Sequence, residues 1–138
     1  MDKIKQLFLL ALSTLTLYSA AAVYEKTVFA EWDKPSINVF YVLPQEVNDQ
    51  TEILFIIHGN SRNADGYIEV WANHAKDKNI ILIAPEFSRS KFSNYNTLQM
   101  SSSTGKILKN RDLYLNNSID IMFNYYKNLF GVKTDLYK

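Results

Sequence analysis

The feature that most constrains this chain is a continuous apolar run that ends abruptly in a polar loop. The run is Ile-Leu-Phe-Ile-Ile at residues 53–57, and His58, Gly59, Asn60 and Ser61 follow it directly. A short run rich in β-branched residues, without polar alternation, predicts a strand that is buried on both faces. The turn after such a strand is where an α/β protein places its chemistry. We therefore expect the fold to be organised around this strand and the function around the loop behind it.

The next segments predict a helix and a second buried strand. Residues 65–78 carry apolar side chains at helical spacing, and residues 80–85 read Ile-Ile-Leu-Ile-Ala-Pro. The apolar positions of the helix are Ile68, Trp71, Ala72 and Ala75. Strand, helix and buried strand in this order form a βαβ unit, which implies a parallel sheet with a right-handed crossover.

Residues on either side of this unit predict further elements. Residues 37–43 are rich in β-formers and stop at Pro44, and residues 23–32 alternate loosely like an edge strand. Residues 112–130 repeat apolar side chains every three or four positions, and Gly131 follows as a C-cap. The expected fold class is therefore α/β, with a mostly parallel sheet and two covering helices.

Composition excludes several classes of protein. The 138 residues are 47% hydrophobic, which suits one domain with a core. The net charge is +1 without a basic run, so nothing favours nucleic acid as a partner. The chain has no cysteine, which excludes disulfides and a thiolate nucleophile. Neither His58 nor His74 has further ligand residues at metal-binding spacing, and we expect no metal and no cofactor.

Residues 1–22 are typical of a secretory signal peptide. Lys3 and Lys5 precede an apolar stretch that ends in the small residues Ala20, Ala21 and Ala22. Cleavage after Ala22 would leave residues 23–138 as the mature domain, secreted or periplasmic and without a stable membrane anchor. The alternative is an uncleaved anchor. The apolar stretch of about 17 residues is at the low end of the length that spans a bilayer.

Four motifs follow the expected strands and loops: Phe55-Ile56-Ile57-His58-Gly59-Asn60, Arg62-Asn63-Ala64, Ile83-Ala84-Pro85-Glu86-Phe87 and Tyr95-Asn96. Together they resemble the N-terminal half of an α/β-hydrolase, and more narrowly the secreted esterases related to polyhydroxyalkanoate depolymerases and feruloyl esterases. The resemblance covers roughly residues 36–138. It implies hydrolysis of a small-molecule or polymeric carboxylic ester through a serine acyl-enzyme.

The resemblance also implies roles for individual residues. In this fold the loop after the strand supplies a backbone N–H to the oxyanion hole, which stabilises the developing negative charge. Asn60 is the best candidate donor and Ser61 the next, while Gly59 lets the backbone approach the substrate. His58 would brace the loop by hydrogen bonding, with an ordinary histidine in a strand-end turn as the alternative. Arg62, Tyr95 and Asn96 are candidates for the substrate cleft, although the glycine that often follows Tyr-Asn in the family is Thr-Leu-Gln here.

The family's remaining catalytic residues are missing from this sequence. It contains no Gly-x-Ser-x-Gly nucleophile elbow and no acid and histidine after one. The expected function is therefore that of a fragment of a secreted serine-type esterase, truncated before the elbow and inactive by itself. The alternatives are a non-catalytic secreted binding domain with a half-sheet, and a chain that does not stay folded because its sheet edges are open.

Overall fold

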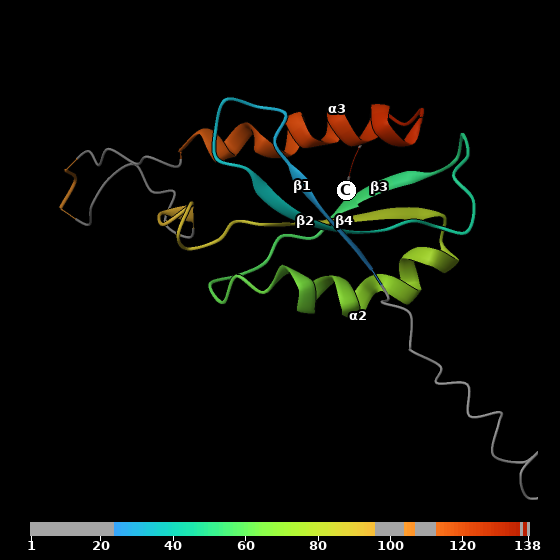
Figure 1. Ribbon diagram of the computed structural model, residues 1–138, viewed down its shortest axis with the longest axis horizontal. Helices are drawn as coiled ribbons and strands as arrows, with labels where there is room; N and C mark the ends of the chain where they lie inside the picture. The colour runs from blue at the N-terminus through green and yellow to red at the C-terminus, as the bar shows by residue number, and fades with distance from the viewer. Residues whose placement is uncertain (1–23, 96–103, 107–112, 136, 138) are drawn as a thin grey trace, which may run out of the picture.

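The computed structural model describes residues 24–95, 104–106, 113–135 and 137. Their main elements form three layers, with a sheet between two helices (Figure 1). The strands are β1 (Glu25–Phe29), β2 (Ile37–Val42), β3 (Glu52–Phe55) and β4 (Ile80–Glu86). The helices are α2 (Ala64–Asp77), the short 3-10 helix η2 (Leu113–Asn117) and α3 (Ser118–Phe130).

The sheet is mostly antiparallel, which corrects the prediction of a mostly parallel sheet. Its strand order is β1-β2-β4-β3. The β1–β2 and β2–β4 pairings are antiparallel, and the β3–β4 pairing is parallel. The βαβ prediction is therefore right for β3, α2 and β4 but wrong when it is extended to the whole sheet. A short connection joins β1 to β2, and such a connection permits only antiparallel pairing.

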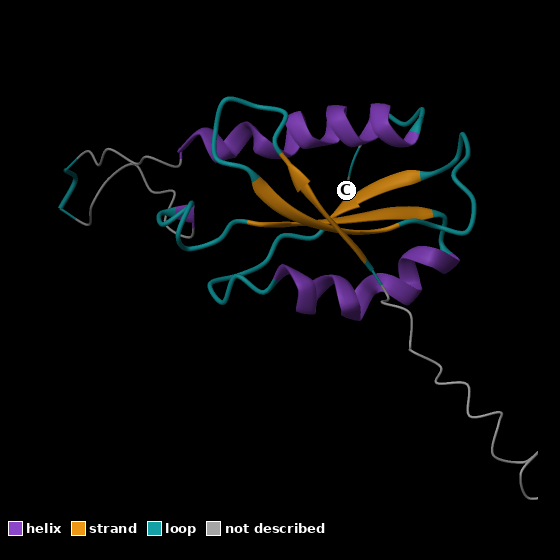
Figure 2. Cartoon of the chain, viewed as in Figure 1, coloured by secondary structure: helices purple, strands orange, loops and turns teal. Residues whose placement is uncertain are grey.

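One long helix lies on each face of the sheet (Figure 2). Alternation of the side chains along the strands divides the interior into two cores, one on each face. In β4, Ile81 and Ile83 point into the core under α3, whereas Leu82 and Ala84 point into the core under α2. The α3 side holds many aromatic rings, among them Phe29 and Tyr126. The α2 side is filled by smaller residues, so α2 packs close to the sheet. Both predicted covering helices are thus present.

The helix ends agree with the sequence at one site and differ at another. Gly131 adopts the left-handed conformation at φ 67°, and its N–H donates to Asn128, as expected of a C-cap glycine. The predicted helix over residues 112–130 is instead divided into η2 and α3. Trp71, which the spacing placed against the sheet, is 48% exposed and lines a hollow with Leu54 of β3 and Leu82 of β4.

Candidate functional site

The loop of residues 58–62 lies at the carboxyl end of β3, beside the segment of residues 87–95 that follows β4. One further hydrogen bond, from the N–H of Ile56 to the carbonyl of Ile83 at 2.8 Å, extends the parallel pairing past the end of β3. Because β3 and β4 run parallel, their carboxyl ends meet at the same edge of the sheet. This edge brings together the sequence-predicted residues His58, Arg62 and Tyr95. Asn96 lies outside the described residues.

His58 is a buried, neutral histidine that joins the 58–62 loop to the 87–95 segment. Its Nε2 accepts a hydrogen bond of 2.9 Å from the backbone N–H of Phe87. An amide N–H can only donate, so the ring proton lies on Nδ1, which donates to the Gly59 carbonyl at 2.9 Å. Burial lowers the pKa of His58 and keeps the ring neutral. Both ring nitrogens are engaged, so neither can serve as a catalytic base in this arrangement.

Arg62 is a buried arginine that binds backbone carbonyl groups of the 87–95 segment. Its residue exposure is 6%. Nη1 donates to the carbonyl of Phe87 and, at 3.1 Å, to that of Phe92. The guanidinium also lies over the ring of Tyr95, 4.6 Å from its centroid. These contacts direct the guanidinium into the protein, and contact between Arg62 and an ester stays a prediction.

Tyr95 closes the connection between the loop and the segment. Its hydroxyl donates to the carbonyl of His58 at 2.8 Å. Its ring stacks on Phe87 with centroids 4.8 Å apart and lies 4.9 Å from the ring of His58. Burial raises the pKa of Tyr95, so the hydroxyl remains a donor at neutral pH. Tyr95 therefore supports the loop, and its role in a substrate cleft stays a prediction.

The 58–62 loop contains a type I turn over residues 59–62. The N–H of Arg62 donates to the carbonyl of Gly59 at 3.2 Å, which closes the turn. Among the described non-glycine residues only Arg62 (φ 61°) and Asn79 (φ 55°) have positive φ. The two central residues, Asn60 and Ser61, therefore have the negative φ angles of a type I turn.

Each of the three consecutive carbonyl groups at the start of the loop accepts a hydrogen bond. The Tyr95 hydroxyl donates to the carbonyl of His58. The ring of His58 and the N–H of Arg62 both donate to the carbonyl of Gly59. Arg89 Nη2 donates to the carbonyl of Asn60 at 2.6 Å. In a trans peptide the C=O and the following N–H point in opposite directions. The anchored carbonyls therefore fix the directions of the next N–H groups along the chain.

Two of these N–H groups have no acceptor within the described part of the chain. They belong to Asn60 and Ser61, the residues that the resemblance proposes as oxyanion-hole donors. Both residues are exposed. Gly59 does not have positive φ, and a Cβ added there would meet only the Tyr67 hydroxyl at 3.7 Å. Neither the backbone nor the packing requires Gly59, which leaves close approach of a ligand as its predicted use.

Sequence reasoning missed one residue of this site, Arg89. It follows β4 in a polar stretch, and nothing in its local pattern separates it from other surface arginines. The available signal was its position after a parallel neighbour strand, where loops from both strands must meet.

The described residues contain no group of three or more His, Cys, Asp or Glu side chains that could hold a metal ion. None of the helices within the described ranges is long and apolar enough to cross a membrane.

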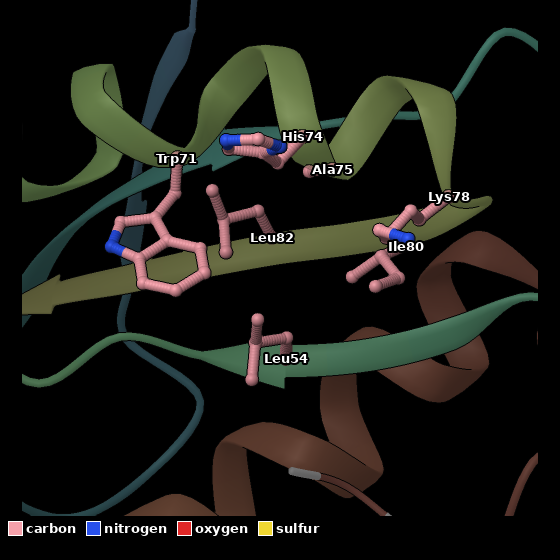
Figure 3. Close-up of a pocket in the computed structure, with 7 residues that line it drawn as sticks. All are labelled: Leu54, Trp71, His74, Ala75, Lys78, Ile80 and Leu82. Carbon is pink, nitrogen blue, oxygen red and sulfur yellow. The ribbon is translucent and has the colours of Figure 1, made fainter.

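An apolar hollow lies at a different place, on the flank of α2 over β3 and β4 (Figure 3). Its volume is about 160 Å³, and Trp71 reaches from α2 toward Leu54 and Leu82. A second hollow of about 350 Å³ shares Trp71 and is also lined by Tyr67 and Val70. We call this surface the α2–β3 flank. It borders the 58–62 loop at Tyr67, whose hydroxyl is the atom that a Cβ on Gly59 would meet at 3.7 Å.

Comparison with solved structures finds hydrolases. Poly(aspartic acid) hydrolase-1 from Sphingomonas sp. KT-1 matches with a TM-score of 0.69 and 30% sequence identity, over 83% of this chain and 44% of that chain. A poly(3-hydroxybutyrate) depolymerase, LpqC from Bordetella parapertussis, matches with a TM-score of 0.55 and 16% identity, over 74% of this chain and 37% of that chain. The second likeness concerns the fold alone.

These matches support a hydrolase-like fold for this chain. The chain corresponds to less than half the length of either structure, with 44% and 37% of those chains covered. No family model matches the sequence, and no curated protein matches it.

Proposed function

We propose that this chain is the N-terminal part of a secreted serine-type acyl hydrolase, most simply a carboxylic ester hydrolase. In this proposal the N–H groups of Asn60 and Ser61 form the loop's half of an oxyanion hole. His58, Arg62 and Tyr95 hold that half in place. The chain alone does not turn over esters, because it contains no nucleophile elbow and no catalytic acid and base.

One observation carries the proposal. The carbonyl groups of His58, Gly59 and Asn60 are all anchored, while Asn60 and Ser61 are exposed residues whose N–H groups lack acceptors within the described residues. Stabilisation of an oxyanion depends on such fixed donors, which need no reorganisation when charge develops.

The comparisons support a polymer joined by ester or amide bonds as the substrate class of the full-length hydrolase. Poly(3-hydroxybutyrate) is a polyester and poly(aspartic acid) is a polyamide, so the printed substrates of both neighbours are polymers joined by acyl bonds. A polymer that cannot enter a cell requires an enzyme outside it. This agrees with the proposed signal peptide at residues 1–22 and with a secreted or periplasmic location.

The open side of the sheet supports the proposal that this is part of a larger hydrolase. Within the described residues, β3 pairs with β4 on one edge, and its other edge carries a single parallel bridge from Ile53 to Tyr137. A strand added parallel to β3 there would end beside the 58–62 loop. The nucleophile would then reach the two proposed donors from that strand.

A direct test is the hydrolysis of short-chain p-nitrophenyl esters by the pure chain. We expect the background rate, because loss of the catalytic residues leaves at most the small effect of binding and the oxyanion hole. Turnover that a serine-directed inhibitor abolishes would overturn the proposed inactivity. Cooperative unfolding of a monomeric chain, together with binding of an ester oligomer without hydrolysis, would favour the alternative of a secreted binding domain.

A loop graft tests the oxyanion role. Residues 58–62 and 87–95 of this chain would replace their counterparts in the Sphingomonas hydrolase, and kcat on poly(aspartic acid) would be measured. We expect the graft to stay active and its Asn60→Pro variant to lose about 10²-fold in kcat, as expected for one lost oxyanion donor. Proline is favoured at the second position of a type I turn, so this variant removes the N–H without breaking the turn. Equal kcat values for the graft and its proline variant would exclude Asn60 as a donor.

A further inference from the structure

Arg89 is an exposed arginine that reaches across to the 58–62 loop. Its Nη2 donates to the carbonyl of Asn60 at 2.6 Å. None of the ion pairs among the described residues includes Arg89. Its positive charge is therefore not neutralised by a carboxylate there, and the loop carbonyl is the contact that orients it.

The segment that carries Arg89 is fixed on both sides of it. On one side Phe87 donates its N–H to His58 and accepts from Arg62. On the other side Phe92 accepts from Arg62 at 3.1 Å and donates its N–H to Ser88 at 2.8 Å. The backbone on both sides of Arg89 is therefore fixed by hydrogen bonds. Because Arg89 extends from this fixed segment, its contact with Asn60 restricts the position of the loop.

Arg89 binds the central peptide unit of the turn, and this unit can rotate as a whole between two turn types. It contains the carbonyl of Asn60 and the N–H of Ser61. Rotation of this unit converts a type I turn to type II, which requires positive φ at Ser61. The N–H of Ser61 would then point in the opposite direction. The Arg89 contact opposes that rotation because it would be lost in the rotated form.

The neighbouring donor is held independently of Arg89. The N–H of Asn60 belongs to the same peptide unit as the Gly59 carbonyl, which accepts from the His58 ring and from the Arg62 N–H. The two candidate donors therefore depend on different anchors, one buried and one at the surface.

We propose that Arg89 is a positioning residue that fixes the direction of the Ser61 N–H and, through its charge on the Asn60 carbonyl, strengthens that N–H as an oxyanion donor. This inference rests on the proposed function of the loop. A charge-assisted hydrogen bond to a carbonyl is stronger than a neutral one, and it polarises the peptide unit so that the N–H on its other side becomes a stronger donor. Arg89 acts on the donor without touching the substrate in this arrangement.

The geometric part of this proposal can be tested on the full chain by NMR relaxation, without any substrate. Arg89→Met removes the donor and keeps much of the apolar stem, and Arg89→Lys keeps a charged donor. We expect the backbone order parameter of the Ser61 N–H to fall from about 0.85 to below about 0.6 in Arg89→Met and to recover in Arg89→Lys. The Asn60 N–H is the internal control and should not change. An unchanged Ser61, or an equal fall at Asn60 and Ser61, would overturn the assignment.

The catalytic part uses the loop graft described above, which carries Arg89. We expect Arg89→Met in the graft to lower kcat about tenfold with KM unchanged, and Arg89→Lys to restore most of it. A raised KM with unchanged kcat would instead make Arg89 a substrate-binding residue and overturn the proposal. The two failures are distinguishable. If Asn60→Pro and Arg89→Met both leave kcat of the graft unchanged, the proposed function fails, whereas an effect of Asn60→Pro alone refutes only the role of Arg89.

Discussion

The 58–62 loop and the α2–β3 flank differ in how their side chains are held. In the loop, His58 and Arg62 are buried, and both ring nitrogens of His58 and Nη1 of Arg62 bind neighbouring backbone groups. On the flank, Trp71 is 48% exposed and Val70 74% exposed, above apolar hollows. The side chains of the first region are anchored by hydrogen bonds, whereas the second presents apolar surface that nothing in the described residues covers.

This difference shows which parts of a hydrolase-like site depend on the rest of the sheet. The anchors of the loop come from two segments, after β3 and after β4, that the βαβ unit brings together. The flank has no such anchors. An anchored loop therefore does not require a covered flank, and the following predictions test that contrast from the largest effect to the smallest.

Removal of the Arg62 guanidinium should weaken the loop most. Arg62→Met would leave the carbonyl groups of Phe87 and Phe92 without this donor in a buried place, at a cost of about 3 kcal/mol. Arg62→Lys should fall between wild type and Arg62→Met, because an ammonium lacks the fork of the guanidinium. Urea denaturation measures the free energy of unfolding. A loss below about 0.5 kcal/mol in Arg62→Met would show that the loop does not depend on this contact.

His58 should make stability depend on pH. Its pKa in the folded chain lies below the ordinary value of 6.5, so on acidification the unfolded chain binds a proton first. The contribution of His58 is therefore fully present above about pH 7 and is lost as the pH falls below 6.5, by at most about 1.4 kcal/mol per pH unit. Unfolding free energies at pH 7.5 and 5.5 test this.

His58→Gln is the matched control for the pH effect. Its side-chain oxygen can still accept from the N–H of Phe87, but it does not titrate. We expect the stability of this variant to change less than that of wild type over the same pH interval. The same pH dependence in both proteins would show that another group causes it.

The flank should tolerate a polar substitution that the adjacent core does not. Trp71→Gln should change the free energy of unfolding by less than about 1 kcal/mol and reduce binding of an apolar dye, because the indole is half exposed. Ile68→Gln, one turn away and fully buried, should cost more than about 3 kcal/mol. Similar losses for both variants would mean that the flank is part of the core.

The strands and helices near the organising run were largely predictable from sequence. The spacing of Ile68, Ala72 and Ala75 predicted α2, and the run at residues 80–85 predicted β4, because these patterns depend only on local periodicity. The direction of β2 was not predictable in this way. Its place between β1 and β4 rather than beside β3 is set by contacts between residues far apart in the chain.

The candidate site shows the same division. The sequence marked the His-Gly-Asn-Ser loop, because its residue types and its place after a buried strand are local properties. It named Arg62 only as a candidate for the substrate cleft and gave Arg89 no role, since both look like surface residues beside loops.

By itself, then, the sequence determined the elements, the central βαβ unit and the loop that we propose as half of an oxyanion hole. Only the tertiary structure decided that Arg62 turns inward to the carbonyls of Phe87 and Phe92 while Arg89 reaches the carbonyl of Asn60. The physical reason is that an arginine's role depends on which acceptors lie within its reach. Those acceptors come from a segment that the parallel pairing of β3 and β4 brings to the same edge of the sheet.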